Sequence, residues 1–475
     1  MFNLTDSKKF MKRIAAFILL FGAVFLIFSK YVKIVRYPRF GLNDFYRYIE
    51  KDMVDVLCVG SSHVSCSINP VQMYDDYGIA AYDLSGPSQS IWFSYFFALE
   101  GLKTQKPSIV ILDVYTVITA DDYFDSKIEA NLLNMKPSYD KYKALQASNA
   151  ENISSILFEF PVTHSRYRQL RKEDYNIDKN NDLCLGYPYH PGSVPYPQEQ
   201  IIDVRGGVES TPISAKAEEY LRKTIELVQK NEIEMILVNS PWPDIREEHQ
   251  KKYNYVQQIA DEYGVPFLNG CLYTEEIGLD YTVDSMGDGG HLNHTGATKY
   301  TKWLSDYLKA NYELPDRRGD ARYKVWEHES KKLKAIIHKN SLMAINDIYG
   351  YLDNIQSNEI YYIITMDGNQ SEKGDDICNS LSAYGIDIQQ NGICIMNGSK
   401  KVFCAKGEEE YQYCQYFNDS VLYVHNKDGK NTVLWNRMAH KAVENGFNIL
   451  VYDCVLDEVI ERIGFDADND YIAVR

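Results

Sequence analysis

The sequence predicts an α/β protein with an N-terminal membrane helix, a main domain built on a parallel sheet and a smaller C-terminal α/β domain. Three observations lead to this prediction. An uncharged apolar run stands near the N-terminus. Short apolar strands then alternate with helical patterns, a rhythm that implies a parallel sheet with helices on both faces. The rhythm restarts after a charged boundary near residue 315.

The composition fits a globular protein of two or three domains. The chain has 475 residues, of which 45% are hydrophobic and 24% are charged, so it can bury a full core. The net charge of −16 argues against a nucleic-acid partner, because phosphate binding needs clustered Lys and Arg. The nine Cys are widely spaced, without a Cys-x-x-Cys pair. They predict neither a disulfide framework nor a zinc site.

The apolar run extends from Ile14 to Phe28 and carries no charge. It is short for a membrane span of about 20 residues, but Lys30 and Lys33 can reach the interface and extend it to about Val35. The alternative is a cleaved signal peptide, and no small-x-small cleavage site follows the run. We therefore expect a cytoplasmic N-terminus, an uncleaved signal anchor and a connector, at residues 1–13, 14–35 and 36–51.

The charges around this anchor do not decide its orientation. Four basic residues precede the apolar run and four follow it closely. The positive-inside rule is therefore nearly balanced. The expectation of a single-pass membrane protein with its large C-terminal part outside the cytoplasm rests on the family resemblance given below.

The main domain is expected over residues 52–315, with five strands in its sheet. Each strand is a short apolar run, and the runs lie at 54–59, 80–84, 108–114, 234–239 and 265–268. Helical patterns separate or follow them, at 89–103, 215–231, 247–263 and 297–310. The rhythm breaks at about 119–212, where Pro, Tyr and His residues are interleaved. This stretch is interpreted as an insertion over one edge of the sheet.

A boundary follows the main domain. The segment 313–322 is charged and contains Pro and Gly, and a helical pattern follows at 323–338. We assign residues 316–340 to a linker helix. Helix and strand patterns restart at residue 341, which predicts an accessory α/β domain over 341–475.

The first motif is Gly60-Ser61-Ser62-His63, directly after the first strand. A serine at a strand-to-helix turn presents its hydroxyl at the carboxyl edge of the sheet, where open α/β sheets bind ligands. Gly-Ser-Ser is also a common turn. Taken alone, the motif therefore favours the ordinary turn.

The second motif is Gly-Asp-Gly-Gly-His at residues 287–291, before the last helix of the domain. An Asp three residues before a His can fold back onto one ring nitrogen and leave the other free to accept a serine proton. The glycines permit the tight turn that this requires. The alternative is a polar loop at a helix start, with Asn293 or Thr295 as the N-cap.

Together the two motifs resemble the SGNH (GDSL-type) hydrolase superfamily over about residues 52–312. The Ser comes first, and the Asp-x-x-His block comes last. The sequence is most similar to the membrane-anchored branch of teichoic-acid D-alanylation and alginate and peptidoglycan O-acetylation proteins, in which Gly-Ser-Ser often replaces Gly-Asp-Ser. The resemblance implies a three-layer, flavodoxin-like parallel sheet. It also implies Ser62 as the nucleophile, His291 as the general base and Asp288 as its orienting acid.

The oxyanion donors of that family match less well. Its members use the N–H of the nucleophile, a Gly N–H after the second strand and an Asn side chain after the third. Gly86 fits the second position, but Asp113-Val114-Tyr115 stands where the Asn motif is expected. Asn239, after a later strand, is a speculative substitute. Loss of one donor raises the activation free energy by about 2.7–4 kcal/mol. A replacement donor therefore exists, the enzyme is slow, or the protein is not an enzyme.

Other candidate residues have open interpretations. His63 is a packing or a substrate-contact residue. Tyr187 and Tyr189 of the insertion either stack on sugar rings or pack within a loop. His190 and His249 have no partners at metal-ligand spacing. The sequence therefore predicts no metal and no cofactor.

The resemblance implies acyl transfer to a cell-surface polysaccharide or teichoic-acid-like polymer, with a membrane-bound O-acyltransferase as the partner that supplies acyl groups. One alternative is an esterase that removes acyl groups from such a polymer. Another is a non-catalytic glycan-binding or scaffold protein of an envelope assembly complex. The missing Asn motif supports the scaffold, and the intact Ser, Asp and His oppose it.

The C-terminal domain resembles a compact α/β domain of an interleukin-like secreted family, which also occurs in a sugar-binding glycosyltransferase stem. Three segments carry this resemblance, at 360–367, 381–387 and 446–453. It implies a glycan-binding accessory role. An accessory packing domain is the alternative, and we favour it.

Overall fold

The computed structural model describes residues 4–35, 42–158, 163–170, 175, 183–368, 371–407, 409–418 and 420–475. Two compact units, Met1–Ser330 and Lys331–Arg475, make up the chain. The division falls within α14 (Lys324–Leu342), inside the segment 316–340 that the sequence assigns to a linker helix. The charged segment 313–322 packs on the first unit, where Nη2 of Arg317 lies 2.7 Å from Oδ1 of Asp55.

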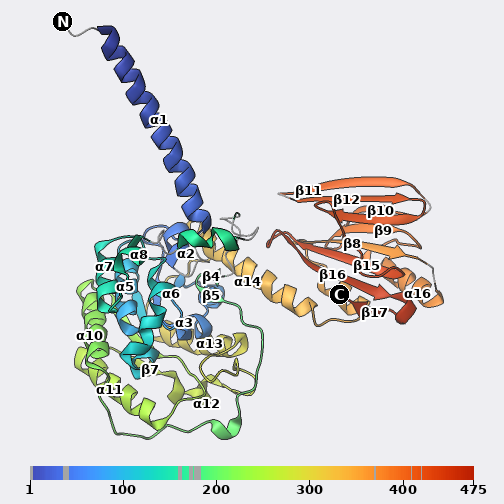
Figure 1. Ribbon diagram of the computed structural model, residues 1–475. Coiled ribbons are helices and arrows are strands. Elements are labelled where there is room, and N and C mark those ends of the chain that lie inside the picture. Colours follow the sequence, from blue (N-terminus) through green and yellow to red (C-terminus); the bar gives the residue numbers. More distant parts are fainter. Residues whose placement is uncertain are drawn as a thin grey trace. The chain divides into compact units, whose positions relative to one another are not determined.

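The N-terminal helix α1 (Leu4–Val35) contains 32 residues (Figure 1). Its stretch Phe10–Val32 is long and apolar enough to cross a membrane. Residues 36–41 of the predicted connector lie outside the described residues. The rest of the connector contains a short helix, α2 (Leu42–Tyr48). A membrane-compatible N-terminal helix is thus present, as the sequence predicts.

Five parallel strands form the sheet of the first unit, in the order β2-β1-β3-β6-β7. The strands are β1 (Val56–Gly60), β2 (Ala81–Ser85), β3 (Ile109–Asp113), β6 (Glu234–Asn239) and β7 (Phe267–Asn269). Each overlaps one of the five predicted runs, so the α/β class with a parallel sheet is confirmed. The chain reverses its direction of winding between β1 and β3. Ligands of open parallel sheets bind at such a point, outside the carboxyl ends of the strands.

Helices cover both faces of this sheet (Figure 1). One face carries α5 (Ile91–Leu102) and α10 (Ala215–Lys230), and the other carries α3 (Ser62–Ser67), α4 (Pro70–Tyr77) and α13 (His294–Asn311). Successive residues of a strand point to opposite faces. Accordingly Cys58 belongs to the same buried cluster as Leu304 of α13, whereas Leu57 lies close to Gly101 of α5.

The insertion contains short helices and one hairpin in its described part. Its elements are η1 (Tyr115–Ile118), η2 (Asp121–Lys127), α6 (Ile128–Leu132), α7 (Tyr139–Ala147), α8 (Ile153–Phe158), η3 (His164–Gln169), β4 (Leu183–Cys184), β5 (Tyr187–Pro188) and η5 (Gln198–Gln200). The hairpin is attached to β2, because the N–H of Asp83 donates to the carbonyl of Leu185 at 3.0 Å. A Cβ on Gly186 would lie 2.2 Å from the carbonyl oxygen of Asp83. Only glycine fits this contact.

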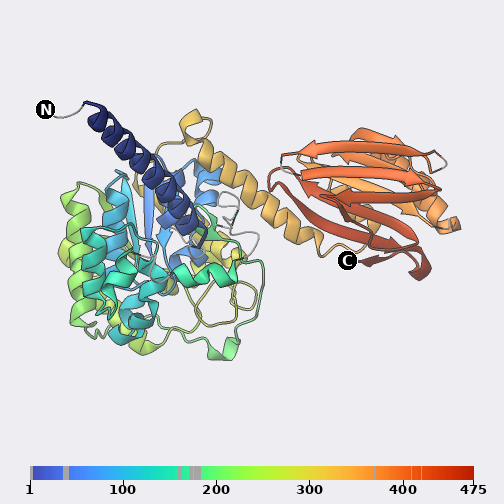
Figure 2. The same ribbon diagram turned by 45° about the horizontal axis from the view of Figure 1, so that its top comes forward.

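The second unit is built from antiparallel sheets rather than from the predicted alternation of strand and helix (Figure 2). One sheet has the order β10-β9-β8-β15-β16-β17 and the other β11-β12-β13-β14. The first contains β8 (Ile360–Asp367), β9 (Ile393–Asn397), β10 (Lys400–Ala405), β15 (Gly446–Asp453), β16 (Glu458–Asp466) and β17 (Ile472–Val474); the second contains β11 (Tyr411–Phe417), β12 (Ser420–Lys427), β13 (Lys430–Trp435) and β14 (Met438–Ala439). Their facing sides share a core with Ile363, Leu422 and Val424. The helices α15 (Ile348–Asn354) and α16 (Glu372–Leu381) contribute to the core on the other face of the larger sheet.

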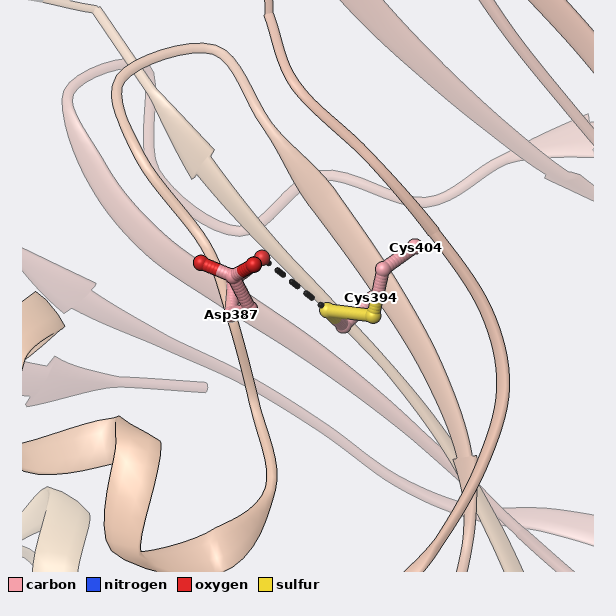
Figure 3. The surroundings of a disulfide bond; sticks show 3 residues. All are labelled: Asp387, Cys394 and Cys404. Carbon is pink, nitrogen blue, oxygen red and sulfur yellow. Dashed lines mark hydrogen bonds between the residues drawn. A yellow bond between two sulfur atoms is a disulfide. The ribbon is translucent and has the colours of Figure 1, made fainter.

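A disulfide joins Cys394 of β9 to Cys404 of β10 (Figure 3). The two residues are directly opposite each other in the antiparallel register, with 4.1 Å between their Cα atoms. The sulfur of Cys394 also contacts the carbonyl oxygen of Asp387 at 3.5 Å. The wide spacing of the cysteines does not predict this pair. Its spacing of ten residues spans a hairpin that the sequence interpretation did not recognise.

Candidate active site

Ser62 stands at the turn between β1 and α3. The helix begins there because the side chain of Ser61 is its N-cap and accepts a hydrogen bond from the N–H of His63 at 3.3 Å. Gly60 makes the turn possible: a Cβ on it would lie 2.6 Å from a methyl group of Val64. The turn places the serine outside the carboxyl end of β1, as the motif predicts.

The loop at residues 287–291 is held in place by hydrogen bonds to the carboxylate of Asp288. Oδ1 of Asp288 accepts hydrogen bonds from the N–H groups of Gly290 and His291, at 3.0 and 2.9 Å. Gly287 has a positive φ of 76°, and a Cβ there would lie 2.4 Å from Val194. Asn293 is the N-cap of α13, as the alternative interpretation predicts. The N-cap and the hydrogen-bonded loop are therefore both present.

Ser62, His291 and Asp288 form one hydrogen-bonded chain. Oγ of Ser62 lies 2.8 Å from Nε2 of His291, and Nδ1 of His291 lies 2.6 Å from Oδ2 of Asp288. An ionised carboxylate only accepts, so Nδ1 carries the proton and Nε2 is free to accept the proton of Ser62. This arrangement can generate a serine nucleophile by general base catalysis.

The carboxylate of Asp288 keeps its charge. Partial burial raises its pKa, but hydrogen bonds from the ring of His291 and from the N–H of Gly290 lower it more. The net result is a pKa below the usual range for Asp. Asp288 is therefore ionised at neutral pH and stabilises an imidazolium on His291.

The two predicted oxyanion residues are engaged elsewhere. The N–H of Gly86 donates to the carbonyl of Gly60 at 3.3 Å. The side-chain NH₂ of Asn239 donates to Oδ1 of Asn269 at 2.8 Å and lies 3.5 Å from the sulfur of Cys271. Neither group is directed at Ser62. Within the described residues, the N–H of Ser62 itself has no acceptor.

His63 lies beside the triad. Its ring stacks on that of Tyr115, with centroids 3.4 Å apart and an interplanar angle of 16°. The ring of Trp242 meets it edge-on at 6.2 Å, and the ring of His291 lies 5.0 Å away. His63 is only 2% exposed, so its position is fixed by aromatic contacts.

Asp113 joins the ends of β3 and β6 and thereby positions these aromatic residues. Its carboxylate accepts hydrogen bonds from the N–H groups of Tyr115 at 3.0 Å and Ser240 at 2.9 Å. Burial raises the pKa of Asp113 to about 6, although both N–H groups oppose this. From the sequence, residues 113–115 are interpreted only as the place where the Asn motif of the family is missing. The carboxyl ends of adjacent parallel strands lie at one sheet edge. The positions of Tyr115 and Trp242 after two such strands could therefore have indicated that both lie near Ser62.

The two Tyr residues of the insertion lie against the start of α13. The hydroxyl of Tyr187 lies 2.8 Å from Nδ1 of His294, and Tyr187 is 1% exposed. Tyr189 meets the ring of His294 edge-on at 4.8 Å. The fully buried Tyr187 offers no ring face to a sugar. Tyr189 is half-buried.

A cavity of about 430 Å³ lies between the insertion and the loop after β7. Its walls come from residues 198–205, 242–245 and 271–281. Trp242 lines it and also contacts His63. The cavity has the size of a small-molecule site. In the described residues, no group of three or more His, Cys, Asp or Glu side chains is arranged to hold a metal ion.

Comparison with known proteins gives little further guidance. No protein-family model matches the sequence, and no curated protein matches it. One similar solved structure is a Vlm2 thioesterase domain with genetically encoded 2,3-diaminopropionic acid, bound with a dodecadepsipeptide. The match has 12% identity and a TM-score of 0.16, and covers 56% of this chain and 96% of that domain. A likeness of this extent carries no argument about fold or activity.

Proposed function

We propose that this protein is an SGNH-type serine acyltransferase that acylates a cell-surface glycopolymer through an ester on Ser62. The observation that carries the proposal is the hydrogen-bonded chain from Ser62 through His291 to Asp288. The sheet order β2-β1-β3-β6-β7 supports it, because it is the order of flavodoxin-like folds with a site beside the first strand.

In the first half-reaction, Oγ of Ser62 attacks the carbonyl carbon of an acyl donor, and its proton passes to Nε2 of His291. The carbon–oxygen bond to the donor breaks, and the leaving oxygen takes the proton from His291. In the second half-reaction, a polymer hydroxyl gives its proton to His291 and bonds to the acyl carbon. The bond to Ser62 then breaks, and Oγ recovers the proton. Asp288 stabilises the imidazolium in both halves.

Two features support a site on the outer side of a membrane. The N-terminal helix is long and apolar enough to anchor the chain. The disulfide between Cys394 and Cys404 is typical of oxidising, extracytoplasmic compartments. We therefore propose a membrane-bound O-acyltransferase as the source of acyl groups and a polysaccharide or teichoic-acid-like polymer as the acceptor.

An esterase that uses the same residues is the second candidate. The side chains of Asp288 and His291 are 45% and 25% exposed, so water can reach the triad. Water would then take the place of the polymer hydroxyl in the second half-reaction. The two functions share the ester on Ser62 and differ in its acceptor.

Labelling with a fluorophosphonate probe tests the proposal. We expect the wild-type protein to be labelled and Ser62→Ala to remain unlabelled, with Ser65→Ala on the same helix as the matched control. Absence of label on folded wild-type protein would exclude both enzymatic functions. Turnover of 4-nitrophenyl acetate with and without a chito-oligosaccharide then separates transfer from hydrolysis. If free acetate is the sole product at every acceptor concentration, transfer is wrong and the esterase remains.

A further inference from the structure

In the described residues, the amides placed to stabilise an oxyanion at Ser62 are engaged with other acceptors. Gly86 donates to Gly60, and Asn239 donates to Asn269. Asn131, which lies next to Gly86, uses its NH₂ on the carbonyls of Pro87 and Lys127, both at 3.0 Å. A tetrahedral intermediate on Ser62 would therefore have the N–H of Ser62 and require a second donor.

We propose that His63 is this donor: a neutral imidazole whose Nε2–H hydrogen-bonds the oxyanion formed on an acyl group attached to Ser62. The inference rests on the proposed function and assigns a catalytic residue to it. His63 follows the nucleophile directly in the chain and faces the triad loop. Nε2 is the nearest atom to the position that a Cβ on Gly290 would occupy, at 3.8 Å.

The burial of the ring determines which nitrogen carries the proton. Nδ1 of His63 is fully buried and has no hydrogen-bond partner. A buried N–H without an acceptor is rarer and more costly than a buried lone pair without a donor. A neutral ring has one N–H, so we assign it to Nε2, on the side of Gly290. Among the described residues, the hydrogen bond of His63 is made by its backbone N–H and not by Nε2, so Nε2 is available to a ligand.

The surroundings keep this imidazole neutral. Burial lowers the pKa of His63 well below its usual value, and the nearby His291 lowers it further. A cation at this position would oppose the imidazolium that forms on His291 during the reaction. A neutral N–H donor stabilises the oxyanion without that conflict.

Stacking on Tyr115 fixes the direction of the donor before substrate binds. The ring planes are 16° apart, and Trp242 blocks the ring at its edge. An oxyanion donor is effective because its orientation costs nothing at the moment of reaction. Tyr115, just after β3, therefore positions the donor. In the family pattern, this segment supplies the donor itself, as an Asn side chain.

The test compares His63→Phe, which keeps a stacking ring without an N–H, with His63→Gln, whose amide places an N–H near the same point. Hydrolysis of 4-nitrophenyl acetate gives kcat and KM, and inhibition by phenylboronic acid, which forms a tetrahedral adduct on serine, gives affinity for a transition-state-like species. We expect His63→Phe to lower kcat by about 10²–10³-fold, with KM little changed. The affinity for phenylboronic acid should fall in parallel, and His63→Gln should recover part of both.

His249→Phe is the matched control. His249 lies on α11 (Glu247–Tyr263), its ring centroid is 5.3 Å from that of Trp242, and it does not contact His63. Thermal unfolding verifies that each variant is folded. If wild-type protein is neither labelled nor active, the proposed function fails. If wild-type protein is active and His63→Phe matches it, or His63→Gln is no better than His63→Phe, the donor role alone is overturned.

Discussion

Nε2 of His291 lies 2.8 Å from Oγ of Ser62, although 229 residues separate them in the chain. The sheet makes this contact: Ser62 leaves the carboxyl end of β1, and His291 ends a loop that leads into α13 on one face of the same sheet. The contact depends on Asp288, which binds the ring of His291 and two N–H groups of its own loop. The first prediction concerns this carboxylate.

Asp288→Asn should lower kcat for an acyl ester by about 10⁴-fold, because an amide stabilises the wrong tautomer of His291 and no imidazolium. The loop should persist, since the amide oxygen can still accept the N–H groups of Gly290 and His291. Measurement of kcat together with circular dichroism checks both statements. Asp244→Asn, outside the triad, is the control. Activity within tenfold of the wild type would remove Asp288 from the mechanism.

His291→Ala should abolish fluorophosphonate labelling while the protein remains folded. His291 lies on a partly exposed loop, and its loss creates no large cavity in the core. Labelling and the thermal unfolding midpoint are measured on the same sample. His294→Ala, three residues further on and hydrogen-bonded to Tyr187, provides the comparison. Wild-type labelling of His291→Ala would show that another base activates Ser62.

The parallel sheet of the first unit could be predicted because each strand is a short, uniformly apolar run bounded by turns. The contact of Ser62 with the Asp-x-x-His block could be anticipated because Ser62 directly follows the first run and the block precedes the last helix, in the order of the family that the sequence resembles; its catalytic role stays a prediction. The contacts of His63 could not, since they depend on Tyr115 and Trp242 from two other strand ends. Gly86 and Asn239 illustrate the same limit: the sequence locates them near the sheet edge but does not show which acceptor each amide meets.

The antiparallel sheets of the second unit were not predicted, because the predicted alternation of strand and helix leaves out its hairpin turns. Asp428 and Gly429 both have positive φ and connect β12 to β13, which is the signature of a two-residue hairpin. Asn436 and Arg437 do the same between β13 and β14. Recognition of these hairpins would have predicted an antiparallel sheet. The Cys394–Cys404 pair lies across a different two-residue turn, Gly398-Ser399, between β9 and β10.

Tyr187→Phe should destabilise the protein by about 1 kcal/mol and leave kcat and KM within twofold of the wild type. The substitution removes the hydrogen bond between the phenol and His294, which is worth about this amount, and the buried ring keeps its packing. Urea unfolding and ester turnover measure the two effects. Tyr189→Phe should change neither. A large rise in KM for a glycan acceptor with Tyr187→Phe would restore the sugar-contact interpretation.

Asp113 should make the stability of the protein depend on pH. Its folded pKa of about 6 exceeds the unfolded value of about 3.9, so the folded state binds the proton more tightly. The stabilisation is complete below about pH 4 and is lost as the pH rises through 6, by about 3 kcal/mol for a difference of two units. Asp113→Asn lacks this dependence.

Urea unfolding of wild type and Asp113→Asn at pH 4, 6 and 8 tests the sign of this effect. The difference in unfolding free energy should shift in favour of the variant as the pH rises. Asp76→Asn, an exposed residue, should follow the wild type. A difference that is constant between pH 4 and 8, or that shifts towards the wild type, would contradict the raised pKa of Asp113.

Cys404→Ser should destabilise the second unit by about 2–4 kcal/mol, because the disulfide with Cys394 constrains the unfolded chain. The activity of the first unit should not change, since the triad lies wholly within it. Dithiothreitol should lower the unfolding midpoint of the wild-type second unit and leave Cys404→Ser unaffected. Cys414→Ser, an exposed free thiol on β11, should retain the wild-type response. Equal midpoints of the wild type with and without reductant would show that the pair contributes no stability, and the argument for an oxidising compartment would then lose its structural support.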